Sequence, residues 1–212
     1  MDDTSGNANG RGRAHGAEAI LDYWFGGETD DRAVAQQKGR IWWAKDEASD
    51  REIATRFGAD LQAAAAGEYE DWAATPAGLL ALVLLTDQFP RNIHRGRPQS
   101  FAYDALALRW SLAGLARGAD LALRPIRRAF LYMPLEHAES PELQERAVQL
   151  FDGLLREVPE AHREVFRGFC NFARRHREVI ARFGRFPHRN AILGRPSTPE
   201  EIAFLRTPGS SF

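Results

Sequence analysis

The sequence predicts an all-α protein, and three observations lead to this fold class. Apolar residues recur with helical spacing along most of the 212 residues. Cap-plus-proline pairs, which start helices, occur at Thr75-Pro76, Ser140-Pro141 and Thr198-Pro199. No alternating apolar and polar pattern bounded by hairpin signals occurs anywhere.

The first half of the chain predicts four helices. A short amphipathic helix, Ala17–Phe25, is closed by Gly26-Gly27, and a second helix covers residues 30–44. Ser49 or Asp50 caps a third helix that stops at Gly67. The fourth helix covers residues 75–88, because Pro90 disfavours the α conformation at the residue before it.

The second half predicts helices over residues 100–117, 125–133, 140–157, 162–183 and from 198 onward. Pro134 breaks the second of these, and residues 135–140 continue it after a kink. The connections are short, so successive helices should pack antiparallel, either as a bundle or as a superhelix of stacked helix pairs. Residues 17–212 form one domain, after a tail, residues 1–16, whose composition predicts disorder.

Composition gives no global pull toward nucleic acid or membrane, because the net charge is only -1. Arginines concentrate in residues 174–195, but no recognised nucleic-acid-binding module accompanies them. The longest apolar run, residues 77–85, is too short to span a bilayer. Cys170 is the single cysteine, which favours a reducing compartment. These features indicate a cytoplasmic protein.

Residues 87–96, here called the first corner, place an acid, arginines, an amide and an imidazole after a strongly apolar helix. Asp87 continues the apolar stripe of that helix, so its carboxylate needs a partner, and Arg91 lies one turn further on. Two interpretations stay open: a buried Asp–Arg pair that fixes the helix exit, or a carboxylate that orients a ligand-binding arginine. Asn92 could cap the helix end or contact a ligand.

Residues 184–190, here called the second corner, repeat the Phe-Pro pair of the first corner after another amphipathic helix. The second corner carries Arg185, His188, Arg189 and Asn190. Guanidinium groups bind carboxylates and phosphates in a forked geometry, so an anionic ligand is the natural prediction. We expect the two corners to face a common pocket.

Two histidines are candidates for acid–base chemistry. His137 follows Met133 on one helix face, and Glu136 and Glu139 lie together on another, so a base and its orienting carboxylate are available. His176 points inward from an amphipathic helix. Each histidine could equally be a satisfied core group. His137, His176 and Glu139 could also hold a metal, but no metal-binding motif is present, and neither a metal nor another cofactor is predicted.

Four segments resemble the bacterial family of unknown function DUF924. The segments are Ile20-Leu21-Asp22-Tyr23-Trp24-Phe25, Leu85-Thr86-Asp87-Gln88-Phe89-Pro90-Arg91-Asn92, the run from Phe130 to Glu139, and the run from Phe183 to Asn190 with Leu193-Gly194-Arg195. The resemblance covers residues 17–212. It implies a TPR-like superhelix of antiparallel helix pairs, with about eight to ten helices. It implies no activity, substrate or catalytic residue.

Three hypotheses about function follow. The leading one is a polar pocket that binds an anionic small molecule or peptide, with Asp87, Arg91, Asn92, Arg185, His188, Arg189 and Asn190 as its residues. The second is an enzyme that uses His137 or His176 as general base, with the arginines stabilising developing charge. The third is a protein-interaction scaffold in which both corners are structural clamps. The sequence leaves open whether the protein forms a homodimer.

Overall fold

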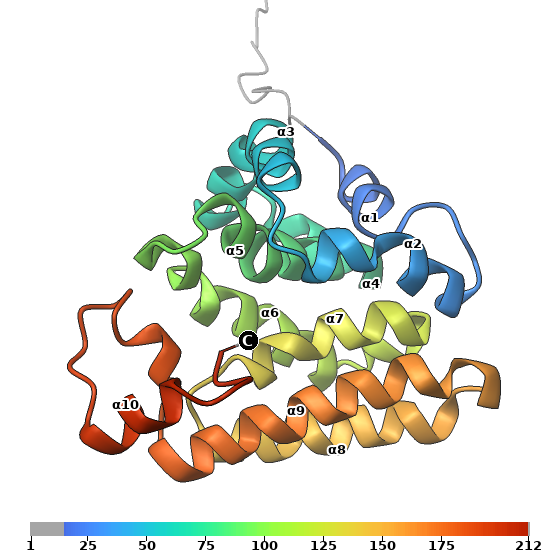
Figure 1. Cartoon of the computed structure of the whole chain (residues 1–212). Helices are drawn as coiled ribbons and strands as arrows, with labels where there is room; N and C mark the ends of the chain where they lie inside the picture. Colours follow the sequence, from blue (N-terminus) through green and yellow to red (C-terminus); the bar gives the residue numbers. More distant parts are fainter. Residues whose placement is uncertain (1–14, 212) are drawn as a thin grey trace, which may run out of the picture.

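The computed structural model describes residues 15–211, and within this range it is entirely helical, with no strand (Figure 1). Short connections and 3-10 turns join the α-helices. The helices are α1 (Ala17–Phe25), α2 (Asp31–Trp43), α3 (Glu47–Ala65), α4 (Pro76–Val83), α5 (Phe89–Ile93), α6 (Asp104–Ala116), α7 (Pro125–Glu136), α8 (Pro141–Glu157), α9 (Arg163–Phe183) and α10 (Pro199–Leu205). The all-α prediction is confirmed.

The cap-plus-proline pairs start helices as predicted. The hydroxyl groups of Thr75, Ser140 and Thr198 accept hydrogen bonds from backbone N–H groups in the first turns of α4, α8 and α10. At α10 the side chain of Glu201 also bonds back to the backbone of the cap residue, which completes a capping box. These local signals therefore fix where three of the helices begin.

Two predicted helix starts are wrong. Helix α3 begins at Glu47, because the side chain of Asp46 accepts from the N–H of Ala48 and takes the cap role predicted for Ser49 or Asp50. Helix α6 begins at Asp104 instead of residue 100, because Pro98–Phe101 forms a separate 3-10 turn. This turn brings Phe101 beside the start of α6.

The sequence predicts that Pro90 and Pro134 interrupt their helices, but neither proline does so. A π-helical turn, Leu84–Gln88, follows α4 and places the N–H of Phe89 on the carbonyl of Leu84. The wider turn accommodates the Pro90 ring, which would clash with a carbonyl in a regular α-helix, so the helix continues into α5. Helix α7 continues through Pro134, and the N–H of His137 resumes the helical pattern on the carbonyl of Met133.

Two groups of helices pack on each other. Helices α1 to α5 form the upper part of Figure 1, and α7, α8 and α9 lie side by side in the lower part. Helix α4, whose residues from Gly78 to Val83 are all buried, contacts α1, α6 and α7 and so joins the two groups. The finer prediction of a TPR-like superhelix stays a prediction.

The predicted disordered tail, residues 1–16, lies outside the described residues except for its last two. His15 is described, and its backbone N–H and ring Nδ1 both contact the buried carboxylate of Asp60. No helix in residues 15–211 has the length and apolar character needed to cross a membrane.

Candidate functional site

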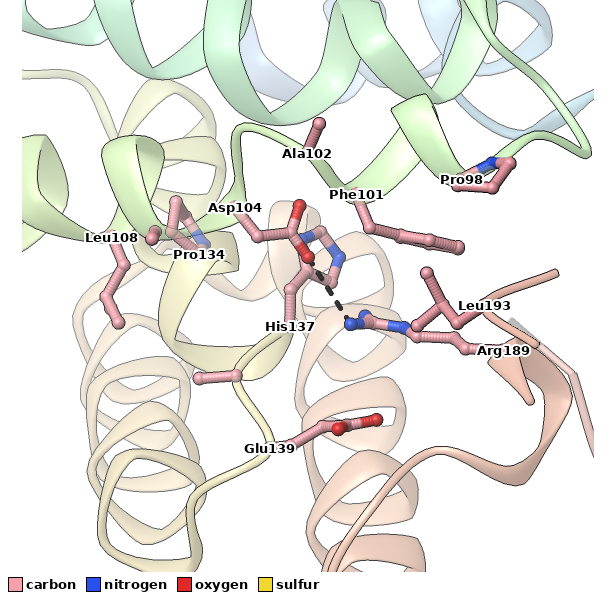
Figure 2. Close-up of a pocket in the computed structure, with 12 residues that line it drawn as sticks. Pro98, Phe101, Ala102, Asp104, Leu108, Pro134, His137, Glu139, Arg189 and Leu193 are labelled. Carbon is pink, nitrogen blue, oxygen red and sulfur yellow. Dashed lines mark hydrogen bonds and ion pairs between the residues drawn. The ribbon is translucent and has the colours of Figure 1, made fainter. Parts of the chain in front are cut away.

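The two corners meet at one carboxylate, that of Asp104 at the start of α6. Arg91 Nη1 donates to Asp104 Oδ1 over 2.9 Å, and Arg189 Nη1 donates to Asp104 Oδ2 over 3.3 Å. The second of these contacts is drawn in Figure 2. Asp104 therefore joins two arginines that are nearly a hundred residues apart in the sequence.

A cavity of about 360 Å³ opens beside this junction (Figure 2). Its size lies in the range of small-molecule sites. Four polar side chains contribute to its wall, those of Asp104, His137, Glu139 and Arg189. The rest of the wall is apolar and consists of Pro98, Phe101, Ala102, Ala105, Leu108, Pro134, Ala138 and Leu193.

Arg91 is well neutralised by two carboxylates. Besides its bond to Asp104, its Nη1 lies 3.4 Å from Asp87 Oδ1 and donates to the Asp87 carbonyl over 2.6 Å. Burial by itself would lower the pKa of Arg91, but Asp87 and Asp104 outweigh burial and raise it above its usual value. This arrangement matches the interpretation in which an Asp–Arg pair fixes the helix exit.

Arg189 is a less well neutralised cation. Its residue is only 7% exposed, and its guanidinium lies over the rings of Phe101 and Phe186 at 4.6 and 4.5 Å. Burial, and then the neighbouring Arg91, lower the pKa of Arg189 to about 10, and Asp104 offsets this only in part. The buried Nε–H of Arg189 donates to no group in the described part of the chain.

Asp87 and His137 form a carboxylate–imidazole pair in which Asp87 is buried and His137 is partly exposed. Asp87 is fully buried, its Oδ1 lies 2.7 Å from His137 Nδ1, and its Oδ2 accepts from Gln88 Nε2 over 2.6 Å. Although burial opposes ionisation, Arg91 and His137 hold the pKa of Asp87 well below its usual range. An ionised carboxylate can only accept, so Nδ1 of His137 carries the proton.

His137 is held in its neutral form. Burial is the largest cause that lowers the pKa of its imidazole, and Arg91 lowers it further, while Asp87 offsets these effects only in part. With Nδ1 protonated and bonded to Asp87, the lone pair is on Nε2. His137 is also part of the cavity wall, so a neutral imidazole stands at the site (Figure 2).

The second predicted base, His176, lies outside the cavity wall. It is 4% exposed, and its Nδ1 lies 3.0 Å from Glu136 Oε1 and 2.9 Å from the carbonyl of Phe172. Its ring centroid is 6.1 Å from that of His137. His176 is therefore packed outside the cavity wall, where it is paired with the carboxylate of Glu136.

Glu139 reaches the cavity, but it does not orient His137 as the sequence suggested. Both its carboxylate oxygens accept from Arg195, over 2.7 and 2.9 Å, and Oε1 also accepts from the N–H of Phe186. The carboxylate that bonds His137 is Asp87, from a different helix. Through these hydrogen bonds, Glu139 links the second corner to the end of α7.

Of the seven predicted ligand-binding residues, Arg189 is part of the cavity wall and the other six lie outside it. Asp87 and Arg91 are described above, and the remaining four have partners elsewhere. Arg185 binds Glu201 over 2.7 and 2.8 Å, and Asn190 donates to Ser197 and Glu201, so both tie the second corner to α10. Asn92 donates to Asp50 of α3 over 2.9 Å. His188 is half-buried, and desolvation, together with Arg189, lowers the pKa of its imidazole to about 3.

Sequence reasoning missed Asp104 and Phe101, which complete the site. Asp104 sits in the first turn of its helix, where an acid is expected for the helix dipole alone, so nothing local indicates that it also joins two arginines. Phe101 lies in the unpredicted 3-10 turn. Only a long-range pairing signal could have identified them. No group of three metal-ligating side chains occurs in residues 15–211.

The fold and the cavity define an all-helical protein with a cavity whose wall includes Arg189 of the second corner and, among the described residues, none of the first corner. The chain belongs to the family described as bacterial protein of unknown function (DUF924), whose model matches residues 20–209. A solved structure of a protein of unknown function from Agrobacterium tumefaciens is similar, with 36% identity and a TM-score of 0.76. The match covers 90% of this chain and 96% of that chain. The comparison with curated proteins gave no significant match.

Proposed function

We propose that the protein binds a small organic anion in this cavity, with the charged group of the ligand against Arg189 of the second corner. The observation that carries this proposal is the state of Arg189, a cation that is 7% exposed, shares one carboxylate with Arg91 and forms part of the cavity wall. A buried charge with incomplete pairing is unfavourable, and an anionic ligand relieves that cost.

The cavity wall indicates the kind of anion. A guanidinium presents parallel N–H groups that match a carboxylate, and Arg189 is the arginine of the cavity wall. The rest of the wall is largely apolar, with Phe101, Leu108 and Leu193 among its residues. A ligand with one carboxylate and a hydrocarbon part of a few carbons fits a cavity of about 360 Å³. A peptide would enter by its terminal carboxylate.

The clamp hypothesis explains some of the arginines but not this one. Arg91 and Arg185 each have close carboxylate partners and higher than usual pKa values, as expected for structural ion pairs. Arg189 has a lowered pKa and a single, longer bond to Asp104. A residue whose role is purely structural would be better paired. The incomplete pairing of Arg189 therefore supports the binding proposal.

Ligand-dependent stabilisation tests the proposal. We expect benzoate and hexanoate to raise the Tm of the full-length protein, and their neutral amides to raise it much less, because binding to the native state stabilises it. Arg189→Met should abolish the carboxylate-dependent shift. Arg182→Met is the matched control, since Arg182 pairs with Glu200 on the surface and does not contribute to the cavity wall.

Two outcomes would overturn the binding proposal. One is that neither carboxylate gives a larger shift than its amide. The other is that Arg189→Met and Arg182→Met respond to the carboxylates equally, which would place the binding elsewhere on the molecule.

A further inference from the structure

The Asp87–His137 pair has no role in binding an anion, yet it lies at the cavity. We propose that His137, positioned by Asp87, is a general base that activates water for hydrolysis of an ester group in the anion bound at Arg189. This inference rests on the proposed function for its substrate class, a carboxylate-bearing ester. The catalytic residue is His137, and Asp87 is a positioning residue.

The geometry of the imidazole carries the proposal. Nδ1 is engaged by Asp87 at 2.7 Å, so the ring cannot turn without breaking a buried bond. Within the described part of the chain, no donor bonds to Nε2, and His137 is part of the cavity wall. A carboxylate behind a histidine whose second nitrogen is open to a site is the arrangement in which histidine accepts a proton from a reactant.

The supporting backbone is rigid and unusual. Asp87 lies in the π-helical turn Leu84–Gln88, all of whose residues are buried. Such turns interrupt α-helices and occur frequently at functional sites. The carboxylate is further held by Gln88 Nε2 and by Arg91. His137 caps the end of α7, directly after the proline-containing turn. Both members of the pair are therefore fixed by helices instead of loops.

The chemistry of the wall indicates that water is the attacking group. Among the described residues that form the wall there is no serine, threonine, cysteine, tyrosine or lysine to act as nucleophile. Asp104 is bonded to two arginines and Glu139 to Arg195, so neither carboxylate is free to take a proton. His137 is the remaining base, and the cavity is open to solvent.

The reaction balances without a further reactant. His137 Nε2 takes a proton from water as the water oxygen forms a bond to the ester carbon, and the carbonyl electron pair moves onto the carbonyl oxygen. The charge of the imidazolium is balanced by Asp87, and the developing oxyanion lies in the field of Arg91 and Arg189. The carbonyl then re-forms, the bond to the alcohol oxygen breaks, and that oxygen takes the proton from Nε2.

A matched pair of esters tests the step and its substrate class. The mono-4-nitrophenyl ester of adipic acid carries a carboxylate, and 4-nitrophenyl hexanoate has the same chain length without it. We expect the full-length protein to release nitrophenolate faster from the adipate ester. His137→Gln should lower kcat for both esters about 100-fold or more. Arg189→Met should lower kcat/KM for the adipate ester much more than for the hexanoate ester, and so remove the preference.

His162→Gln is the control for removal of a histidine. His162 also pairs with an aspartate, Asp30, at 2.9 Å, but it lies outside the cavity wall. This variant should hydrolyse both esters at the wild-type rate. Acylation by diethyl pyrocarbonate, located by mass spectrometry, gives a second measurement: His137 should be modified faster than the packed His176, and benzoate should protect it.

Asp87→Asn separates positioning from structural support. Because the charge of Asp87 raises the pKa of His137 against the effect of burial, its removal should lower kcat and move the acid limb of the pH–rate profile to lower pH. A variant that is merely less stable would keep the wild-type profile. The charged and titratable groups around His137, apart from Asp87, are Arg91, Asp104, Glu136, Glu139, His176, His188 and Arg189.

The outcomes distinguish the two proposals. If carboxylates bind through Arg189 but neither ester is hydrolysed in a His137-dependent way, the general-base inference is wrong and the anion site stands. If hydrolysis depends on His137 but shows no preference for the adipate ester, the anion site is wrong. Slower acylation of His137 than of His176 would also overturn the general base, whatever the stability of the variants.

Discussion

The first corner and the second corner share a Phe-Pro pair and an arginine that bonds Asp104, but their backbones differ. The first corner is helical up to Ile93, because a π-helical turn carries the chain through Pro90, and residues 94–96 then form a turn. The second corner leaves its helix through Gly184, which has a φ of 68°, and continues as the 3-10 turn Pro187–Arg189.

The two arginines differ in charge environment as a result. Arg91 lies one helical turn after Asp87 and gains a second carboxylate from Asp104, so its pKa is raised. Arg189 ends the 3-10 turn Pro187–Arg189, its guanidinium lies over two aromatic rings, and Asp104 is the carboxylate that it bonds among the described residues; its pKa is lowered to about 10. Similar sequence segments thus place their arginines in different charge environments, and the proposed function assigns ligand binding to Arg189 and support of the fold to Arg91.

The largest effect should come from exchanging these two arginines for methionine separately. Arg91→Met leaves the fully buried Asp87 without its cation and should lower the free energy of unfolding by about 3 kcal/mol or more. Arg189→Met replaces an incompletely paired cation by an apolar chain between Phe101 and Phe186, so a change within about 1 kcal/mol is expected. Denaturant unfolding monitored by circular dichroism measures the free energy of unfolding of each variant.

Both variants lose one of the two arginines that bond Asp104. The difference between their free energies of unfolding therefore reports how much more Arg91 supports the fold than Arg189 does. Equal destabilisation would mean that Arg189 supports the fold as much as Arg91 does. In that case the argument for an available cation would fail.

A smaller effect concerns the carboxylate that ties the second corner to α10. Hydrogen bonds from Arg185, with smaller contributions from Thr198 and Asn190, lower the pKa of Glu201 to about 2. A group whose pKa is depressed in the folded state stabilises the protein above its unfolded pKa, and this stabilisation is lost as the pH falls through the folded pKa. Stability should therefore fall between about pH 5 and pH 2.

Glu201→Gln should remove part of that pH dependence and lower the free energy of unfolding at pH 7 by about 2 kcal/mol. Glu200→Gln is the matched control, because it removes only an exposed pair with Arg182, and pairs of this kind contribute little. Acid unfolding curves at several pH values make the measurement. Identical curves for Glu201→Gln and wild type would show that Glu201 does not hold the second corner.

The sequence predicts what depends on local chemistry. The hydroxyl caps at Thr75, Ser140 and Thr198 and the pairing of Asp87 with Arg91 follow from spacings of a few residues, and the structure shows all of them. Errors arise where packing overrides a local rule. The local rule ends a helix before Pro90, and a buried π-helical turn accommodates the proline instead.

The partners of the site residues could not be predicted, because they come from distant helices. The sequence pairs His137 with a neighbouring glutamate, but Asp87 is brought to it by the contact of α7 with the π-helical turn Leu84–Gln88. The helix-start residue Asp104 gives no sign that it joins two arginines. A single sequence contains the residue types of the site but not the tertiary contacts that select among them.

The smallest predicted effect tests how the second corner leaves its helix. Gly184 adopts a left-handed conformation, and a Cβ there would meet no atom within 4 Å, so any cost of Gly184→Ala is a backbone cost of about 1 kcal/mol. Gly168 lies within the same helix, α9, and also has open space where a Cβ would stand, so Gly168→Ala should stabilise the protein by about 0.5 to 1 kcal/mol. Thermal unfolding of the two variants under identical conditions should move Tm in opposite directions. Stabilisation by both substitutions would mean that the corner does not need the left-handed residue, and its backbone would then differ from the first corner less than the structure indicates.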